Sequence, residues 1–353
     1  MSPPFSGPYD FETGVYRPPS EGGSRSLLVR FTRNCPWNRC GFCAMYREQR
    51  FEVRPVVQIK SDIDAMAAIA KALDGISRKI GHGGAITQET AVALIHQTPE
   101  LNFHQGFGMV CDWLRAGAGS AFLQDANSLI MKTAPFIEAL HYLHQTFPSI
   151  HRVTSYARSR TLMRKSLDEL KAIRDAGLDR LHVGLETGDD GLLRNVNKGV
   201  SAQGHIEGGR KAMEAGFQLS EYWMPGLGGK SMSEPHAIQT ARVLNAIDPH
   251  YIRSRPFYPL PGTSLFKKVH DGTLELLSPR EQLMELKQMI ESLNVESRVC
   301  FDHAGNYWKN RAGAILFSQS YEGYKFPEEK TTVLALIDEG LKAKNQCPGN
   351  LRL

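Results

Sequence analysis

The sequence predicts an α/β fold, a partial (βα)6 TIM-like barrel made of six strand–helix units. Short apolar runs typical of buried strands alternate with longer segments whose apolar residues recur every three or four positions, as in helices. Several helical segments stop at a glycine just before the next strand, such as Gly177 and Gly216. Elements in this order form a parallel sheet through right-handed crossovers, and six units are fewer than the eight that close a barrel.

The predicted elements begin with an apolar strand at 26–31, which a cysteine-rich loop follows directly. The first helix is predicted at 61–73 because its apolar residues fall three or four positions apart. Residues 75–118 are less regular. The remaining strands are predicted at 120–124, 151–156, 180–185, 217–223 and 250–256, with helices at 134–147, 166–176, 203–215 and 234–247.

Three regions are predicted along the chain. Residues 1–25 are rich in proline, glycine and serine and predict an extended N-terminal arm. Residues 26–269 form the core barrel. Residues 270–353 break the alternation of strands and helices and predict a mostly helical C-terminal region.

Composition is that of an ordinary globular protein, with 41% apolar and 22% charged residues. The net charge of +5 is mild, and no lysine–arginine run indicates a nucleic-acid partner. No apolar stretch reaches the roughly 18 residues of a membrane span, and the N-terminus lacks the features of a signal peptide. Together with reduced thiols, these features predict a cytoplasmic protein.

Three cysteines stand within nine residues, at Cys35, Cys40 and Cys43, with the spacing C-x4-C-x2-C. Three thiolates can hold three irons of a four-iron cluster and leave the fourth iron open to a ligand. Zinc is the weaker alternative because no fourth ligand is near; the next histidine is His82. The remaining cysteines are isolated and predict ordinary buried or surface side chains: Cys111, Cys300 and Cys347.

Polar residues gather where the predicted strands end. The strand at 120–124 is followed by Asp125, Ser155 and Arg158 lie at the end of the strand at 151–156, and the strand at 180–185 is followed by Glu186. A glycine-rich loop at 223–229 follows the next strand. In parallel barrels the chemistry sits at the carboxyl ends of the strands. A glutamate that ends an apolar strand also needs a polar partner. We therefore expect these side chains and the cysteine loop to form one chemical site.

The chain resembles the radical S-adenosylmethionine (SAM) superfamily, in the branch of oxygen-independent coproporphyrinogen oxidase, Elp3-like proteins and methylthiotransferases. The resemblance is carried by residues 32–46 around the cysteines, 170–199 around Glu186 and 253–263, which include Pro261-Gly262-Thr263. The superfamily's commonest loop is C-x3-C-x2-C. The first gap here is one residue longer.

The resemblance implies a [4Fe–4S] cluster on the three cysteines and SAM as the second cofactor. It assigns six residues to SAM: Phe42 near adenine, Asp125 at the ammonium, Ser155 at the ribose, Arg158 and Lys198 at the carboxylate, and Glu186 as a polar ligand. The alternatives are a loop-core Phe42, a helix-capping Asp125 and a solvated Arg158.

The implied reaction is reductive cleavage of SAM to a 5′-deoxyadenosyl radical that abstracts hydrogen from an unidentified substrate, expected to be a small molecule. The implied electron donor is an external protein such as flavodoxin or ferredoxin. Two alternatives stay open. One is transfer of an aminocarboxypropyl or other group by cleavage of a different C–S bond of SAM. The other is an iron–sulfur electron-transfer or sensor protein.

Overall fold

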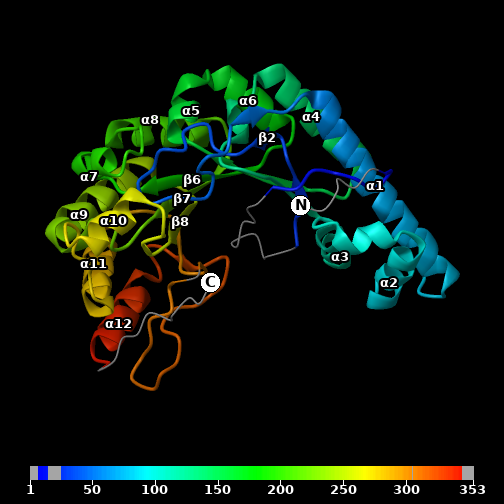
Figure 1. Cartoon of the computed structure of the whole chain (residues 1–353). Helices are drawn as coiled ribbons and strands as arrows, with labels where there is room; N and C mark the ends of the chain where they lie inside the picture. The colour runs from blue at the N-terminus through cyan, green and yellow to red at the C-terminus, as the bar shows by residue number, and fades with distance from the viewer. Residues whose placement is uncertain (1–6, 15–24, 304, 344–353) are drawn as a thin grey trace. The chain divides into compact units, whose positions relative to one another are not determined.

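The computed structural model describes residues 7–14, 25–303 and 305–343, so most of the predicted N-terminal arm lies outside it. The described chain divides into two compact units, in which helices cover strands (Figure 1). The first unit contains residues up to 36, residues 50–156 and residues 171–180. The second contains residues 37–49, 157–170 and 181 onwards.

The first unit is built on three parallel strands, β1 (Leu27–Val29), β4 (Ser120–Leu123) and β5 (Arg152–Ala157). Buried residues occupy the middle of each strand, and Leu28, Phe122 and Thr154 align across the three. The long helix α1 (Val56–Lys79) packs beside α4 (Thr133–Thr146), as Figure 1 shows. A short antiparallel pair, β2 (Thr32–Arg33) and β3 (Glu52–Val53), flanks the cysteine loop.

Two helices occupy the segment whose sequence is less regular, α2 (Gln88–Gln97) and α3 (Phe107–Arg115). Thr87 begins α2 by accepting a hydrogen bond from the Thr90 amide, as part of a capping box. Such a cap can begin a helix whose apolar residues show no long helical period. A 3-10 turn at Pro99–Phe103 then separates two helices of only ten and nine residues. Each helix is too short for a helical period to stand out in the sequence, so this segment is more regular than expected.

The second unit places β6 (Arg180–Glu186), β7 (Gln218–Trp223), β8 (Tyr251–Ser254), β9 (Arg298–Cys300) and β10 (Tyr324–Lys325) side by side in chain order. β7, β8 and β9 are parallel, whereas β10 is antiparallel to β9. Seven helices accompany them: α5 (Ser159–Arg164), α7 (Asp190–Asn195), α8 (Ala202–Glu214), α9 (Gly229–Ile247), α10 (Ser264–His270), α11 (Pro279–Ser292) and α12 (Lys330–Leu341). Helix α6 (Leu167–Asp175) spans the point where the chain passes between the units.

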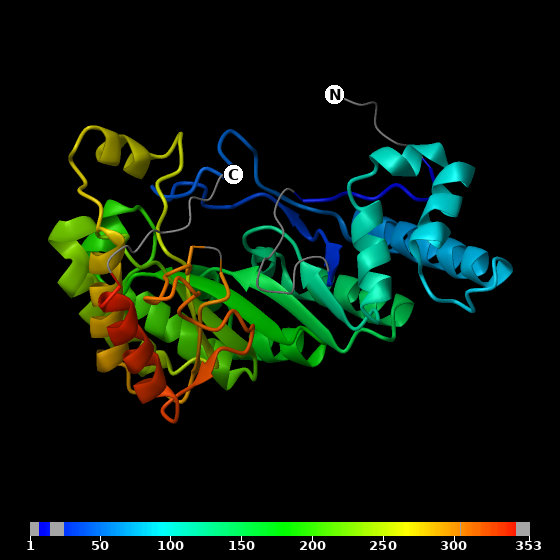
Figure 2. The same ribbon diagram turned by 90° about the horizontal axis from the view of Figure 1, so that it is seen from below.

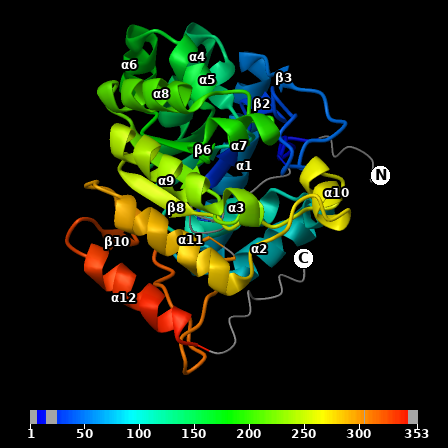
Figure 3. The same ribbon diagram turned by 90° about the vertical axis from the view of Figure 1, so that its left-hand side faces the viewer.

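The predicted α/β class and its mostly parallel strands are confirmed, and no described pairing closes either set of strands into a full barrel. In the C-terminal region α11 and α12 lie side by side (Figure 3), but the described residues between them, 293–303 and 305–329, form strands and loops, so a mostly helical region is not confirmed. The same region adds two strands that the sequence did not indicate. Strand β9 extends the parallel order, and red α12 lies against orange β10 in Figure 2.

None of the described helices is both long and apolar enough to cross a membrane.

A buried ion pair fastens the C-terminal region to β8. Arg253 is fully buried, and its Nη1 donates to Asp302 Oδ1 at 2.9 Å and to the Tyr321 carbonyl at 3.1 Å. The guanidinium also lies over the rings of Tyr321, 4.0 Å from its centroid, and Tyr251, at 5.0 Å. Removing one partner of a buried pair leaves an uncompensated charge, which is more costly than the pair is stabilising.

Replacing Asp302 with alanine is therefore expected to lower the free energy of unfolding by about 3–5 kcal/mol. Asp338→Ala is the matched control, because it removes an exposed carboxylate that Lys287 contacts at 2.7 Å. Urea unfolding should give a much lower midpoint for the Asp302 variant and a nearly unchanged midpoint for the control. Equal midpoints for the two variants would contradict this account.

Candidate functional site

The predicted residues Glu186 and Lys198 form an ion pair at the carboxyl end of β6. Lys198 Nζ donates to Glu186 Oε1 at 2.7 Å, and both side chains are only about a tenth exposed. Gly184 leaves room for the pair, because a Cβ there would lie 2.1 Å from Glu186 Oε1. Glu186 also has a φ of 65°, in the left-handed region that non-glycine residues seldom adopt. Such strained positions concentrate at functional sites.

The turn after α7 carries Lys198 and binds the cysteine loop. Asp189 begins α7 by accepting a hydrogen bond from the Leu192 amide, and the helix ends at Asn195. The carbonyl of Val196 then accepts a hydrogen bond from the Gly41 amide at 2.7 Å. The carbonyl of Asn197 accepts one from Trp37 Nε1, also at 2.7 Å. The turn therefore fixes the loop on either side of Cys40.

Arg158 joins the same group from the end of β5. Its Nη2 donates to the Lys198 carbonyl at 2.7 Å, and its guanidinium lies 5.1 Å from the centroid of the Trp37 ring. The alternative of a wholly solvated Arg158 is thus wrong, since its side chain is half-buried and contacts the turn. A guanidinium presents donors in a planar fork that suits a carboxylate.

Phe42 packs on an apolar cluster of the second unit and also lies near Lys198. The cluster draws its side chains from α7 and the turn after it, the loops after β7 and β8, and α10. Lys198 Nζ lies 5.7 Å from the centroid of the Phe42 ring. The cluster members are Leu192, Val196, Met224, Leu227, Phe257 and Leu265. The expected loop-core contact is therefore present, and the same packing orients the aromatic ring beside the ion pair.

Cys40 lies within electrostatic reach of all three charged residues. Burial raises the pKa of its thiol, the positive charges of Lys198 and Arg158 lower it, and Glu186 raises it. Arg47 donates to the Cys40 carbonyl at 2.9 Å and so holds the loop backbone. The second unit thus gathers Arg158, Glu186 and Lys198 around one cysteine of the predicted cluster loop.

Asp125 and Ser155 belong to the first unit and are both fully buried. Asp125 Oδ2 accepts a hydrogen bond from Arg30 Nε at 2.5 Å, while its Oδ1 has no partner among the described residues. Its φ of 69° matches the unusual backbone of Glu186. Ser155 Oγ donates to the Tyr156 carbonyl at 3.1 Å. The SAM contacts predicted for these two side chains stay predictions.

The loop cysteines divide between the units, with Cys35 in the first and Cys40 and Cys43 in the second. All three are free thiols and partly exposed. Across the described residues, no group of three or more histidine, cysteine or acidic side chains is placed to hold a metal ion. The chemistry of the donor set nevertheless fits an iron–sulfur cluster, because its ligands are cysteine thiolates and these thiols lie on one short loop.

Sequence reasoning missed the contact between Trp37 and Gly199, and it missed Glu221. Gly199 has a φ of 76°, and a Cβ there would lie 2.5 Å from the Trp37 ring. Nothing local in the sequence indicates a contact between residues so far apart. Glu221 is fully buried on β7, and neither carboxylate oxygen has a described partner. Burial raises the pKa of Glu221 well above its usual value. The sequence signal for this buried carboxylate was a glutamate within an otherwise apolar strand, between Leu219 and Trp223.

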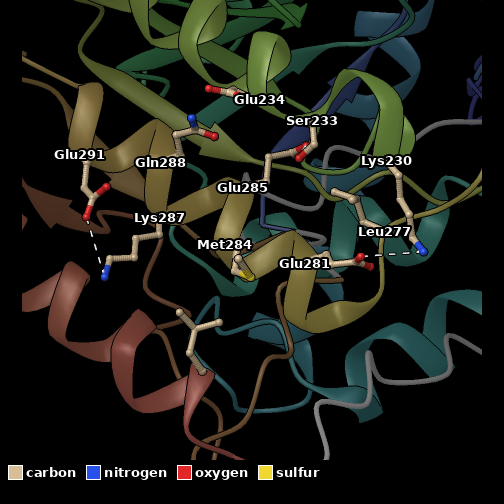
Figure 4. Close-up of a pocket in the computed structure, with 11 residues that line it drawn as sticks. Lys230, Ser233, Glu234, Leu277, Glu281, Met284, Glu285, Lys287, Gln288 and Glu291 are labelled. Carbon is tan, nitrogen blue, oxygen red and sulfur yellow. Dashed lines mark hydrogen bonds and ion pairs between the residues drawn. The ribbon is translucent and has the colours of Figure 1, made fainter.

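A surface pocket of the second unit lies apart from these residues, between α9 and α11 (Figure 4). Its charged side chains largely contact one another or their neighbours. Lys230 lies 3.8 Å from Glu281, Lys287 lies 3.8 Å from Glu291, and Ser233 Oγ donates to Glu285 at 2.7 Å. The pocket therefore presents few unsatisfied groups for a ligand.

Comparison with known proteins identifies the class. Residues 114–241 match the sequence profile of the Radical SAM superfamily. The heme chaperone HemW of Bacillus subtilis (strain 168) is 31% identical over 132 residues, which are 36% of this chain and 33% of HemW. The match thus spans about a third of that relative. Residues 114–241, about a third of the chain, are therefore similar to the domain that defines the Radical SAM superfamily.

The chain also aligns with solved structures. Methylornithine synthase (PylB) aligns with a TM-score of 0.46 and 15% identity, covering 95% of this chain and 80% of PylB. Coproporphyrinogen III oxidase (HemN) from Escherichia coli aligns with a TM-score of 0.48 and 16% identity, covering 75% of this chain and 51% of HemN.

The matched segment includes five of the six residues assigned to SAM, namely Asp125, Ser155, Arg158, Glu186 and Lys198. Phe42 and the three loop cysteines precede it. The superfamily assignment therefore rests on the barrel segment, and the cluster ligands stay a prediction from the C-x4-C-x2-C loop.

The thiols outside the loop are expected to be inert. Burial raises the pKa of Cys111 to about 11 and that of Cys300 to about 12. At pH 8 at most about one Cys111 thiol in a thousand is then the reactive thiolate. Brief anaerobic alkylation of the folded, cluster-free protein, followed by peptide mass spectrometry, should modify the partly exposed Cys35 and Cys43 well before these two.

The experiment uses a Cys347→Ser background, because Cys347 lies outside the described residues. Urea-unfolded protein is the control, in which all five remaining cysteines should react alike. Alkylation of Cys300 as fast as Cys35 in the folded protein would contradict its burial.

Proposed function

We propose that this chain is an enzyme that cleaves SAM reductively at a [4Fe–4S] cluster held by Cys35, Cys40 and Cys43. The observation that carries the proposal is the Glu186–Lys198 ion pair, with Arg158 bonded to the Lys198 carbonyl, on the turn that binds the cysteine loop through Gly41. When bound, the cluster and SAM together supply the electron and the C–S bond whose cleavage starts hydrogen abstraction from a substrate.

The charged residues suit the methionine end of SAM, which carries a carboxylate and an ammonium. Lys198 and Glu186 offer one charge of each sign, 2.7 Å apart in a mostly buried position. Arg158 adds a guanidinium whose position is fixed by its bond to the Lys198 carbonyl. Because little water reaches these groups, their charges act more strongly on a bound ligand than they would in solvent.

Phe42 offers an aromatic face for the adenine end. Its packing on the apolar cluster holds the ring in place without a bound ligand. Asp125, with one oxygen bonded to Arg30 and one without a described partner, is the residue we propose for the SAM ammonium. Ser155 is the residue we propose for the ribose.

The substrate is proposed to be a small molecule, the electron donor an external carrier protein and the location the cytoplasm. These assignments follow from the superfamily chemistry and from the reduced thiols. An electron-transfer protein needs no group of charges arranged for SAM, which is why we favour the enzyme.

The cluster ligands are tested by iron content. Anaerobically reconstituted protein should hold about four irons per chain. Replacing Cys35, Cys40 or Cys43 with alanine should abolish the cluster's visible absorption, because each removes one of three ligands. Cys111→Ala and Cys300→Ala are the matched controls and should keep it, as should a Cys347 variant. Wild-type protein that takes up zinc and no reducible iron would exclude the cluster.

The SAM site is tested with Lys198→Met. Losing a charged hydrogen-bond partner should weaken SAM binding about tenfold or more while iron content stays normal. Lys267→Met, an exposed lysine on α10, is the control and should bind like wild type. Isothermal titration of the reconstituted protein measures the affinities. A far-UV circular dichroism spectrum and a thermal midpoint like those of wild type would show that weak binding by Lys198→Met does not reflect misfolding.

The products decide between the proposed reaction and its alternatives. Dithionite and SAM should give 5′-deoxyadenosine and methionine from wild-type protein, detected by mass spectrometry. Methylthioadenosine as the main product would assign the chain to aminocarboxypropyl transfer instead. Bound iron without any SAM cleavage or SAM-dependent change in the cluster's EPR spectrum would indicate an electron-transfer or sensor protein.

A further inference from the structure

Three arginines surround one tryptophan beside the cysteine loop. The guanidinium carbons of Arg158, Arg39 and Arg160 lie 5.1, 5.4 and 6.0 Å from the centroid of the Trp37 ring. All four residues belong to the second unit. Arg39 and Arg160 are exposed, and Trp37 and Arg158 are partly so. We call these four residues the tryptophan–arginine surface.

The Trp37 ring is held firmly in this position. Its Nε1 donates to the Asn197 carbonyl at 2.7 Å, and the ring packs directly on the backbone of Gly199. A partly exposed aromatic residue fixed in this way gives a binding partner contact area at little entropic cost. Tryptophan and arginine are also the residues most enriched where proteins bind one another tightly.

The charges on this surface are unbalanced. Within the described part of the chain, no carboxylate lies within ion-pair distance of Arg39 or Arg160. Attraction to the ring accounts for the position of each guanidinium. It does not remove their mutual repulsion, which an approaching negative surface would relieve. Such a patch attracts acidic partners over a distance set by the ionic strength.

The position of the tryptophan–arginine surface indicates which kind of acidic partner would bind there. Trp37 lies between the first and second cysteines of the loop, and Arg39 directly precedes Cys40. Two residues lie between Trp37 and Cys40, so their Cα atoms are at most about 11 Å apart when the chain is extended. A protein bound here lies against the loop that is proposed to hold the cluster, where a reductant is needed.

We propose that an acidic one-electron carrier protein docks on the tryptophan–arginine surface. This rests on the proposed function, because only a cluster in the loop requires such a carrier. Single-stranded nucleic acid is the other anionic partner that a tryptophan and arginines suit. It binds by stacking bases on an open aromatic face along a track of positive charge. Here three guanidinium groups already crowd the ring, and the sequence has no lysine–arginine run.

The test measures binding of oxidised flavodoxin, an acidic carrier, to the anaerobically reconstituted full chain by isothermal titration. Binding should be measurable at 50 mM NaCl and weaken about tenfold or more at 500 mM. Arg160→Glu should weaken it by a similar factor, and Arg39→Glu with Arg160→Glu by more. Arg160 lies on α5, outside the cysteine loop, so the single variant spares that loop. Arg242→Glu, an exposed arginine on α9, is the control and should bind like wild type.

Dithionite-driven SAM cleavage separates this proposal from the proposed function. If wild-type protein cleaves SAM with dithionite, and Arg160→Glu does so equally well but binds flavodoxin more weakly, the docking surface is supported. If dithionite cleaves SAM but flavodoxin binds Arg160→Glu and wild type alike, the surface is wrong although the enzyme assignment stands. Tighter binding of a single-stranded oligonucleotide than of flavodoxin, lost in Arg160→Glu, would also overturn it.

Discussion

The mostly buried ion pair between Glu186 and Lys198 is the interaction on which the site depends. It ties the end of β6 to the turn after α7, and that turn in turn holds the cysteine loop through Gly41 and Trp37. Two charges that are largely removed from water are tolerated only when they compensate one another. The pair therefore fixes the position of the loop backbone as well as the charges near Cys40.

Two acidic residues at strand ends, one in each unit, meet the same constraint. Asp125 after β4 and Glu186 at the end of β6 each have a left-handed backbone, and each is neutralised by one cation, Arg30 and Lys198 respectively. In each pair the cation lies within hydrogen-bond distance of the carboxylate, and so it offsets part of the cost of burying that group. Strain at a strand end is then balanced by an ion pair in the folded protein.

Much of the fold could be predicted from the sequence, because the strands carry short apolar runs and several helices end at a glycine. Glu186 was indicated because a charged residue ending an apolar strand needs a partner. The ion pair of Glu186 with Lys198 could not be predicted, because it depends on the small size of Gly184. The contact of Trp37 with Asn197 joins residues 160 positions apart, which no local pattern reveals. Strand β9 is only three residues long, too short for a period to show.

The close packing at Gly184 has a consequence for how related sequences can vary. A methyl group there would lie 2.1 Å from Glu186 Oε1, so a larger residue at position 184 requires the Glu186 and Lys198 side chains to shift. Losing either charge alone leaves the other buried without compensation. Among related sequences, we therefore expect substitutions at positions 184, 186 and 198 to occur together. Covariation of these three positions would then reveal the ion pair in relatives that have no solved structure.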